Sequence, residues 1–265
     1  MKILFLGAGV FGEALSRIVR YNGHETLYYD PYKYPDTRLE DVSKKADLFI
    51  YTAPSEKHQE ILPILPKDVP IICASKGFLS TKPFLKFKHF SALGGAGFAN
   101  NIAEDANITF TASSELSESL FSTETIRVEY TTDTIGIMLC GALKNIYAIG
   151  AGMYGEDNQD NTSRDHLKAY FISVAKEMEK ILSANNASSE TIKLSCGIPD
   201  LVLTCSDDSR NFRFGKNLAN HTAPEEGTIE GLSAINSLKD YPEFIIPDDA
   251  TIIVSIIERV KNATK

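Results

Sequence analysis

Short apolar runs separated by mixed segments mark the first half of the chain. The runs are apolar at successive positions and end at Gly, Pro or polar residues, which is typical of strands buried on both faces of a sheet. They predict strands at Lys2–Leu6, Glu25–Tyr29, Asp47–Tyr51, Pro70–Cys73 and His89–Leu93. Helical spacing between several of them, first at Ala14, Leu15, Ile18 and Val19, predicts a doubly wound parallel sheet of the α/β class.

A helical period replaces the strand pattern after about residue 130. Apolar residues share one helix face at Ile135, Leu139, Ala142, Ile146 and Ile149, and another at Leu167, Phe171, Val174, Met178 and Ile181. A last strand near Ile126–Tyr130 leads into this half without a linker rich in Pro, Gly or Ser. We therefore expect a sheet domain at residues 1–130 and an all-helical domain at residues 131–265.

Composition narrows the classes of partner. The chain has 265 residues, enough for one large domain or two modest ones. Lys and Arg number 27 against 35 Asp and Glu, a net charge of −8, so we expect neither nucleic acid nor a membrane as a partner. The first apolar run stops at Gly7, and none reaches the roughly 18 residues of a membrane span. The sequence thus predicts a cytoplasmic protein without a signal peptide or transmembrane helix.

The cysteines and histidines give no sign of a metal site. Cys73, Cys140, Cys196 and Cys205 lie far apart without histidines at zinc-ligand spacing, and we expect buried thiols. The five histidines occupy no position that indicates a general base. We expect no bound metal.

A glycine pattern follows the first strand directly. Gly7-Ala8-Gly9-Val10-Phe11-Gly12 is a G-x-G-x-x-G that opens a predicted helix, and strand, glycines and helix together form the fingerprint of a Rossmann-type dinucleotide-binding domain. Gly7 permits the tight turn, Gly9 lets the backbone approach a pyrophosphate, and Gly12 allows close packing. The diphosphate would sit on the helix N-terminus. The alternative is a tight turn without a ligand.

Asp30 ends the second predicted strand, about 18 residues after Gly12. An acidic side chain at this spacing accepts hydrogen bonds from the adenosine ribose and repels a 2′-phosphate, which favours NAD over NADP. Lys33 and Arg38 lie nearby and could soften this preference, so NADP stays a second candidate cofactor. The alternative is an acidic loop residue before Pro31.

Further segments follow the glycine loop in a distinctive order. They are Ala53-Pro54-Ser55, Ser75-Lys76-Gly77-Phe78, Gly141-Ala142-Leu143-Lys144-Asn145, Cys196 to Cys205 leading to Ser209-Arg210-Asn211 and Phe212-Arg213-Phe214-Gly215, and Ile229-Glu230-Gly231. Over nearly the whole chain this set resembles the NAD(P)-dependent sn-glycerol-3-phosphate dehydrogenases of bacterial type, in a compact version. The A-L-K-N and D-L-V-L-T-C segments are the most specific.

The resemblance implies reversible hydride transfer between a nicotinamide cofactor and dihydroxyacetone phosphate or sn-glycerol 3-phosphate, which supplies phospholipid synthesis. Lys144 matches the family's proton acceptor, and its apolar helical surroundings suggest a lowered pKa. Arg210 offers a planar fork for a phosphate, and Asn211 an amide donor. Asp200 would hold the lysine or accept from a substrate hydroxyl, and Lys76 would face both ligands. Without the resemblance, a surface role is the commoner one for a helical lysine such as Lys144, and a solvated turn is as good an explanation of Lys76.

The glycine pattern and the resemblance together give the expected site. The expected catalytic residues are Lys144, Asp200 and Lys76. Substrate contacts are expected from Lys76, Gly95, Gly97, Lys144, Asn145, Asp200, Thr204, Ser209, Arg210 and Asn211. Cofactor contacts are expected from Gly7, Gly9, Val10, Phe11, Gly12, Asp30, Pro54, Lys76, Ala99, Arg210 and Glu230.

One segment departs from the family pattern. After the fifth predicted strand the family shows G-P-[ST]-F-A, whereas this chain has Gly95-Ala96-Gly97-Phe98-Ala99. Loss of the proline softens the loop, and loss of the hydroxyl removes a ligand donor at Gly97. The compact form could also expose a face that a second copy covers, so a homodimer is a hypothesis.

Two other functions remain open. A related β-hydroxyacid or ketoacid reductase would bring a substrate carboxylate to Arg210 in place of a phosphate. A sensor or interaction protein would hold NADH without turnover, which the altered Gly95–Ala99 loop favours. The presence of Lys144, Asp200 and Arg210 together argues against the second.

Overall fold

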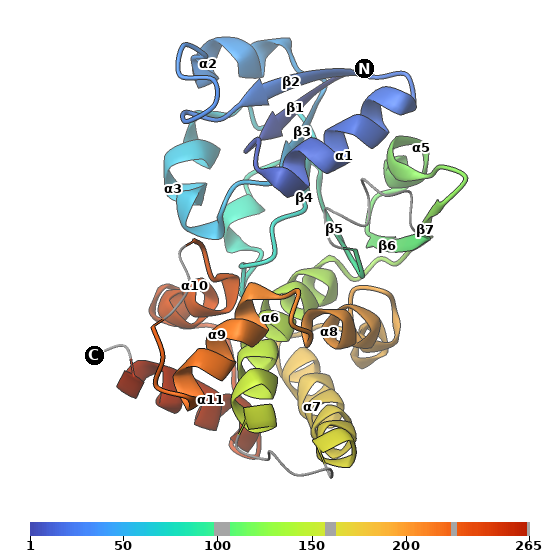
Figure 1. The fold of residues 1–265 in the computed structure, drawn as a ribbon. Helices are drawn as coiled ribbons and strands as arrows, with labels where there is room; N and C mark the ends of the chain where they lie inside the picture. The colour runs from blue at the N-terminus through green and yellow to red at the C-terminus, as the bar shows by residue number, and fades with distance from the viewer. Residues whose placement is uncertain (98–106, 157–162, 224–226, 264–265) are drawn as a thin grey trace.

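The computed structural model describes residues 1–97, 107–156, 163–223 and 227–263. A sheet half lies above a helical half, with helix α6 at the centre of the latter (Figure 1). The sheet strands are β1 (Lys2–Leu6), β2 (Glu25–Tyr29), β3 (Leu48–Tyr51), β4 (Ile71–Cys73), β5 (Phe90–Gly95), β6 (Ile108–Ala112) and β7 (Ile126–Tyr130). The first five lie within one or two residues of their predicted positions.

The strand order of the sheet is β2-β1-β3-β4-β5-β6-β7. The first five strands are parallel, and the order reverses between β1 and β3, which is where doubly wound sheets bind ligands. The expectation of a wholly parallel sheet is wrong at one edge. Strand β6 runs antiparallel to β5, and β7 pairs parallel with β6.

Apolar side chains cover both faces of the sheet, because successive residues of a strand point to opposite sides. Ile3 and Phe5 pack with Leu15 of α1 (Val10–Tyr21), whereas Leu4 and Leu6 belong to the core on the other face. Short helices α2 (Leu39–Val42), α3 (His58–Ile61) and α5 (Leu116–Phe121) complete this half, with single 3-10 turns at Ser43–Lys45, Ser55–Lys57, Leu62–Ile64 and Lys82–Phe84. The doubly wound class is confirmed.

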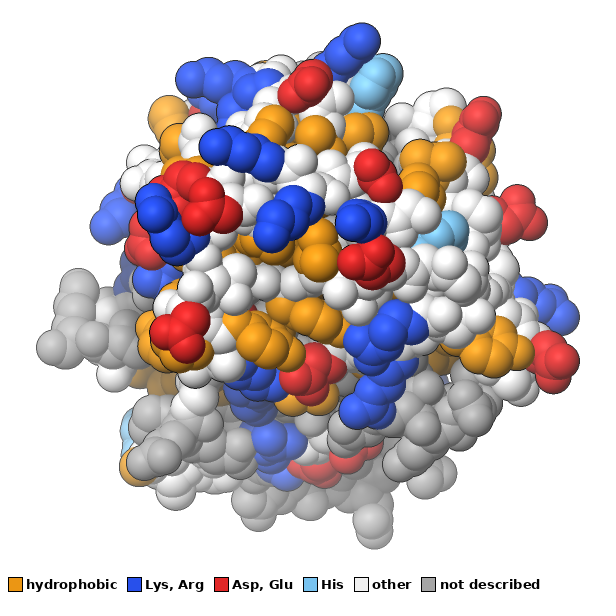
Figure 2. Space-filling view, turned by 90° about the horizontal axis from the view of Figure 1, so that it is seen from above, with side chains coloured by type: hydrophobic (Ala, Val, Ile, Leu, Met, Phe, Trp, Pro, Cys, Tyr) orange, Lys and Arg blue, Asp and Glu red, His pale blue; other side chains and the backbone are white. Residues whose placement is uncertain are grey.

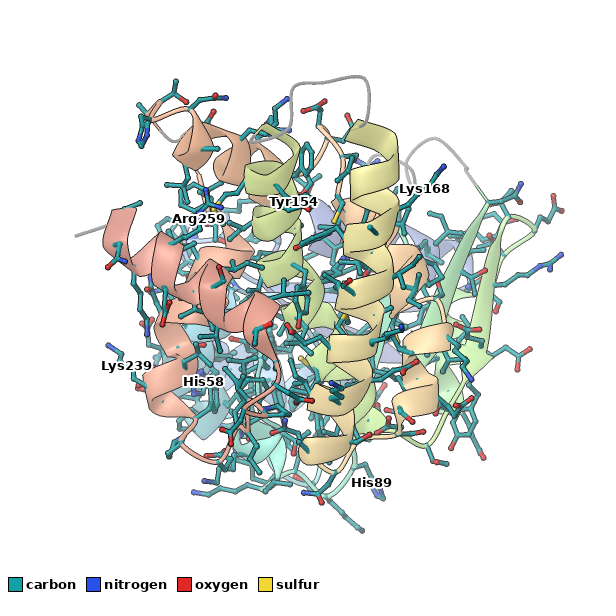
Figure 3. All side chains as sticks on the ribbon, turned by 90° about the horizontal axis from the view of Figure 1, so that it is seen from below. His58, His89, Tyr154, Lys168, Lys239 and Arg259 are labelled. Carbon is teal, nitrogen blue, oxygen red and sulfur yellow. The ribbon has the colours of Figure 1, made fainter. Side chains whose placement is uncertain are left out.

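The second half is helical, as predicted. Helix α6 (Thr134–Glu156) is surrounded by α7 (Ser163–Ala184), α8 (Ile198–Thr204), α9 (Arg210–Ala219), α10 (Glu230–Ser237) and α11 (Thr251–Ala263), and 3-10 turns lie at Ser189–Lys193 and Leu238–Asp240. Seen from below, α6 lies beside α7 and α11 (Figure 3).

Helix α6 is buried on nearly every side rather than on the one face that the sequence period indicated. Within the described residues, the stretch Thr134–Gly155 is the one helix long and apolar enough to cross a membrane, and 94% of its most apolar window is buried inside the fold. Such burial is what the central helix of a packed core shows. It also removes Lys144, in the middle of α6, from water.

Candidate active site

The glycine loop between β1 and α1 has the geometry that its sequence predicted. Gly7 has φ +107°, and a Cβ at this position would lie 2.6 Å from the Ala53 nitrogen, so glycine is required. Thr52 Oγ1 donates to the Gly7 carbonyl at 2.7 Å. A Cβ on Gly12 would lie 2.9 Å from the same hydroxyl oxygen. The loop therefore packs against the end of β3, and Thr52 is a supporting residue that the motif did not reveal.

The start of α1 fits a dinucleotide diphosphate. A side chain at Gly9 would meet no atom within 4 Å, so the space over the loop is open. Gly9 is the N-cap and no side chain caps the helix, whose first N–H groups therefore face this space with the positive end of the helix dipole. Val10 is exposed here. Pro54 lies just beyond Ala53, and its carbonyl accepts from Tyr51 Oη at 3.0 Å.

Asp30 follows β2 and lies against the same loop. Its Oδ2 accepts from the Ala8 N–H at 2.9 Å, and its Oδ1 accepts from the N–H groups of Tyr32 and Lys33 at 3.0 and 3.2 Å. The carboxylate therefore holds the glycine loop in place besides lying at the predicted ribose position. Lys33 Nζ forms an ion pair with Glu13 at 2.7 Å, so this cation already has a partner.

The three expected catalytic residues come together at the junction of the two halves. Lys144 Nζ lies 2.5 Å from Asp200 Oδ1, and Lys76 Nζ lies 3.7 Å from Asp200 Oδ2. The side chains of Lys144 and Asp200 are each 2% exposed, and that of Lys76 is 15% exposed. One carboxylate thus stands between two ammonium groups in a site with little water.

Burial and charge act differently on the two lysines. Desolvation lowers the pKa of Lys144 to about 8. The attraction of Asp200 opposes this shift, and the repulsion of Lys76 adds to it. Desolvation also disfavours the charged form of Lys76, but Asp200 and Glu230 outweigh it and raise the pKa of that lysine. Because both lysines share Asp200, they titrate as one linked group. Lys144 is the member positioned to exchange a proton near neutral pH.

Two residues of helix α8 contact the Lys144 ammonium group. Asp200 lies in its first turn, and Thr204 Oγ1 donates to the Asp200 carbonyl at 2.6 Å. The same hydroxyl accepts from Lys144 Nζ at 3.1 Å. The ammonium group therefore has two fixed oxygen partners from one helix.

A second network lies beside the lysines. Asn145 Nδ2 donates to Glu230 Oε2 at 2.8 Å and contacts the Lys76 carbonyl at 3.4 Å. Asn211 donates to Asn145 Oδ1 at 3.0 Å and accepts from the Gly231 N–H at 2.8 Å. The network joins α6, α9 and α10 to the loop after β4. It brings Glu230, expected at the cofactor, next to the substrate lysines.

Phe11 links the glycine loop to this cluster, because Lys76 Nζ lies 5.3 Å from the centre of its ring. Lys76 follows β4 at the carboxyl edge of the sheet, where ligands of such sheets bind. The expected cofactor and substrate residues therefore adjoin one another in space.

The remaining expected residues have structural surroundings of their own where the structure describes them. Ser209 is the N-cap of α9 and accepts from the Phe212 N–H at 3.4 Å. Arg210 is exposed at the first position of α9, where a Cβ on Gly227 would lie 2.9 Å from its Nη1. Gly95 has φ +139°. A Cβ on Gly97 would lie 3.1 Å from Ile108 Cγ2, and Ala99 lies outside the described residues.

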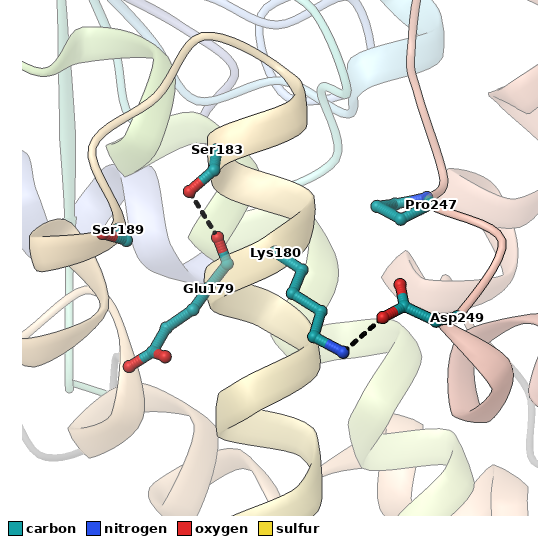
Figure 4. A pocket seen from close by; sticks show the side chains of 6 residues that line it. All are labelled: Glu179, Lys180, Ser183, Ser189, Pro247 and Asp249. Atoms are coloured by element: carbon teal, nitrogen blue, oxygen red, sulfur yellow. Dashed lines mark hydrogen bonds and ion pairs between the residues drawn. The ribbon is translucent and has the colours of Figure 1, made fainter.

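Other parts of the described chain offer no competing centre. His58 Nδ1 lies 2.7 Å from the Ser55 carbonyl oxygen, and His89 is exposed at the edge of the view in Figure 3. Among the described residues, no group of His, Cys, Asp and Glu could hold a metal ion. A surface hollow lies between α7 and the start of α11 (Figure 4). Its Lys180–Asp249 ion pair, 2.6 Å long, is exposed, and none of its lining residues belongs to the Lys144 cluster.

Comparison with known proteins shows which proteins this chain is similar to. The family model described as NAD-dependent glycerol-3-phosphate dehydrogenase C-terminus matches residues 133–261. The chain is 30% identical to a glycerol-3-phosphate dehydrogenase [NAD(P)+] of Agrobacterium fabrum, over 88% of this chain and 85% of that one. It is 28% identical to the protein of that name from Teredinibacter turnerae, over 91% and 85% of the two chains.

Solved structures show the same fold. The glycerol-3-phosphate dehydrogenase of Coxiella burnetii superposes with a TM-score of 0.80 at 22% identity, over 100% of this chain and 98% of that one. A ketopantoate reductase of Ralstonia eutropha gives 0.58 at 14% identity, over the whole of both chains. The fold is therefore shared with reductases that act on other substrates. The family of this chain is shown by its sequence similarity and not by its fold.

Proposed function

Because the chain belongs to the NAD(P)-dependent glycerol-3-phosphate dehydrogenase family, we propose that it interconverts dihydroxyacetone phosphate and sn-glycerol 3-phosphate. The observation that carries this proposal is the Lys144–Asp200–Lys76 cluster at the carboxyl edge of a sheet whose glycine loop fits a dinucleotide. Residues 1–130 would bind the cofactor and residues 131–265 would supply most of the substrate site.

The cofactor would lie on the Gly7–Gly12 loop, with Asp30 at its ribose, and Phe11, Pro54 and Glu230 toward the nicotinamide end. A bound nicotinamide supplies the hydride in reduction and accepts it in oxidation. Lys33 is paired with Glu13 and Arg38 Nε lies 3.8 Å from Asp41, so neither cation stands free beside Asp30. These pairs support NAD as the preferred cofactor over NADP.

Lys144 would exchange the proton of the reaction. Reduction of the ketone leaves charge on its oxygen, and the Lys144 ammonium can donate a proton there; in the reverse direction the neutral amine accepts the hydroxyl proton. Asp200 and Thr204 fix the position of the amine. Lys76 keeps its charge and would stabilise the developing oxyanion.

Arg210 would bind the substrate phosphate, with Asn211 beside it. Its exposed guanidinium adjoins the segment that leads to Glu230, and a charged fork suits a phosphate dianion. Ser209 would act by capping α9 and so presenting both residues. The glycerol 3-phosphate so formed would supply phospholipid synthesis.

A protein of this kind would work in the cytoplasm, without nucleic acid or membrane partners. Cys73, Cys140 and Cys196 are free and buried, which suits a reducing compartment. Figure 2 shows Lys and Arg interspersed with Asp, Glu and apolar side chains on the face above the sheet half. We also propose a homodimer, testable by sedimentation of the purified chain.

One assay tests the proposed function. Oxidation of NADH with dihydroxyacetone phosphate should proceed at enzymatic rates, more slowly with NADPH, and more slowly again with a 2-keto acid or a β-keto acid. Preference for a keto acid would favour the reductase alternative. NADH binding without turnover on any of these substrates would favour the sensor.

A further inference from the structure

The segment before α8 is held by side chains from the far edge of the sheet. The Ser195 N–H donates to Glu129 Oε1 of β7, and the Cys196 N–H donates to Thr111 Oγ1 of β6 at 3.0 Å. Thr111 Oγ1 in turn donates to Glu129 Oε1 at 2.7 Å. Thr111 is fully buried. Two successive backbone N–H groups are thus fixed directly before the helix that carries Asp200.

The side chain of Ser195 adds a second connection. Its hydroxyl donates to the Thr109 carbonyl at 2.5 Å and accepts from the Ala96 N–H at 3.2 Å. Ser195 is 8% exposed, so water competes little for these bonds. One hydroxyl therefore joins the loop after β5 to the start of α8.

The bond from Ala96 is a property of this chain. The pattern that the chain resembles has proline at this position, and proline has no N–H to donate. Ala96 lies between two glycines, which leave the backbone with many conformations. The hydrogen bond to Ser195 restricts the loop where the proline ring would otherwise do so.

We propose that Ser195, supported by Thr111 and Glu129, is a positioning residue that fixes the Gly95–Gly97 loop against α8 and thereby sets the substrate site between this loop and Asp200. The proposal rests on the proposed function, because the substrate contacts expected for that function include Gly95, Gly97 and Asp200. The Ser195 hydroxyl is bonded to the Ala96 N–H and the Thr109 carbonyl, so it acts through the backbone of the loop.

Ser195→Ala removes both side-chain bonds and leaves the half-buried Ala96 N–H without its acceptor. The KM for dihydroxyacetone phosphate should rise on the order of tenfold, as expected for loss of the one hydrogen bond that holds the loop at Ala96, with a smaller change in kcat. The Kd for NADH should change much less than this KM, because the Gly7–Gly12 loop lies at another strand.

Ser113→Ala is the matched control. Ser113 Oγ also accepts a β5 backbone N–H, from Ala92 at 2.9 Å, and a second bond from Thr134 at 2.8 Å, but it lies at the opposite end of the β5–β6 pair. The Ser113→Ala variant should have a lower melting temperature but an unchanged KM for dihydroxyacetone phosphate. Equal KM changes in the two variants, or none in Ser195→Ala, would overturn the proposal.

Thr111 tests the other half of the network. Thr111→Val keeps the shape but removes the acceptor of the Cys196 N–H, and should raise KM as Ser195→Ala does, whereas Thr111→Ser keeps the hydroxyl and should restore it. Equal KM values for the valine and serine variants would count against the network.

Hydrogen exchange separates this proposal from the proposed function. The Ala96 amide should exchange about tenfold faster in Ser195→Ala than in the unmodified protein, whether or not the protein turns over substrate. Absence of turnover in the unmodified protein would refute the function alone. Unchanged exchange at Ala96 would refute the positioning role alone.

Discussion

Lys144 is the residue on which the proposed reaction depends most. Lys144→Met keeps most of the stem and removes the charge and the exchangeable proton. We expect kcat to fall by roughly 10² to 10⁴, the range for a positioned acid or base. Fluorescence titration should show unchanged NADH binding, because Lys144 lies in α6 and the glycine loop in the other half. Loss of NADH binding together with turnover would instead indicate a structural lysine.

The lowered pKa of Lys144 also sets the pH dependence of the two directions. Oxidation of glycerol 3-phosphate requires the neutral amine, so its kcat/KM should rise with pH through about 8. Reduction of dihydroxyacetone phosphate requires the ammonium form and should fall over the same range. Initial rates from pH 6.5 to 9.5 in both directions, about 1.5 pH units either side of this pKa, measure the dependence. Profiles that move in the same direction would contradict the assignment.

In the proposed function, Arg210 distinguishes phosphorylated substrates from others. Arg210→Ala should lower kcat/KM for dihydroxyacetone phosphate by roughly 10- to 150-fold, the effect of one charge-assisted hydrogen bond. Arg210→Lys should keep more of this kcat/KM than Arg210→Ala does, but not all of it, since lysine lacks the planar fork. Unphosphorylated dihydroxyacetone provides the control, because its slow reduction has no phosphate contact to lose. Equal losses of kcat/KM with both compounds would mean that Arg210 supports the fold and does not bind the phosphate.

At the scale of elements, α11 depends on one buried carboxylate. Glu177 of α7 accepts from the N–H groups of Ile252 and Ile253 at 2.9 and 2.8 Å, and from Tyr147 Oη at 2.8 Å. It thus satisfies the start of α11 from outside that helix.

Glu177→Gln keeps the shape but removes the charge and presents N–H groups where acceptors are needed. We expect a loss of about 1 to 3 kcal/mol in the free energy of unfolding, measured by urea denaturation. Glu179→Gln is the control, because it lies two residues on along α7 and lines the exposed hollow of Figure 4. A loss of the same size in both variants would show that the cap contributes nothing.

The elements differ in how far the sequence predicts them. Strands β1, β3 and β4 are buried on both faces, so their apolar runs are continuous and easily recognised. Strand β2 lies at the edge of the sheet and is only half-buried. Strand β6 was missed and its antiparallel pairing with β5 could not be seen, because no local pattern encodes the direction of a partner strand. The glycine loop is local and was predicted residue by residue. Lys144 and Asp200 are distant in sequence, and the family resemblance rather than spacing paired them.

The network around Ser195 shows what sequence reasoning cannot reach. Ser195, Thr111 and Glu129 come from three segments and belong to no motif, and each residue type is common on surfaces. Their function follows from burial and from bonds to backbone N–H groups, which depend on the folded chain. The altered Gly95–Gly97 loop was visible in the sequence, but its new partner was not.

At the scale of the whole molecule, the two halves share one core. A continuous apolar cluster includes Leu4 and Tyr51 of the sheet half together with Leu139, Val174 and Ile253 of the helical half. In addition, Cys196 Cβ and Ile137 Cγ2 would lie 2.9 and 3.0 Å from a Cβ on Gly94, so the helical half packs directly on β5. Such continuity couples the unfolding of the halves, although a chain of this length often unfolds in steps.

We therefore expect one thermal transition in calorimetry, with a ratio of calorimetric to van't Hoff enthalpy near 1. NADH at about 100 times its Kd should stabilise the protein by about 2.7 kcal/mol and move this transition as a whole, although its diphosphate binds the sheet half. A chain whose halves unfold independently would instead show two transitions, of which NADH moves only one. Gly94→Ala tests the coupling directly, since a methyl group there forces the halves apart and should split the transition or broaden it. A single, equally sharp transition in that variant, at a lower temperature, would mean that the shared apolar cluster couples the halves without the close contact at β5.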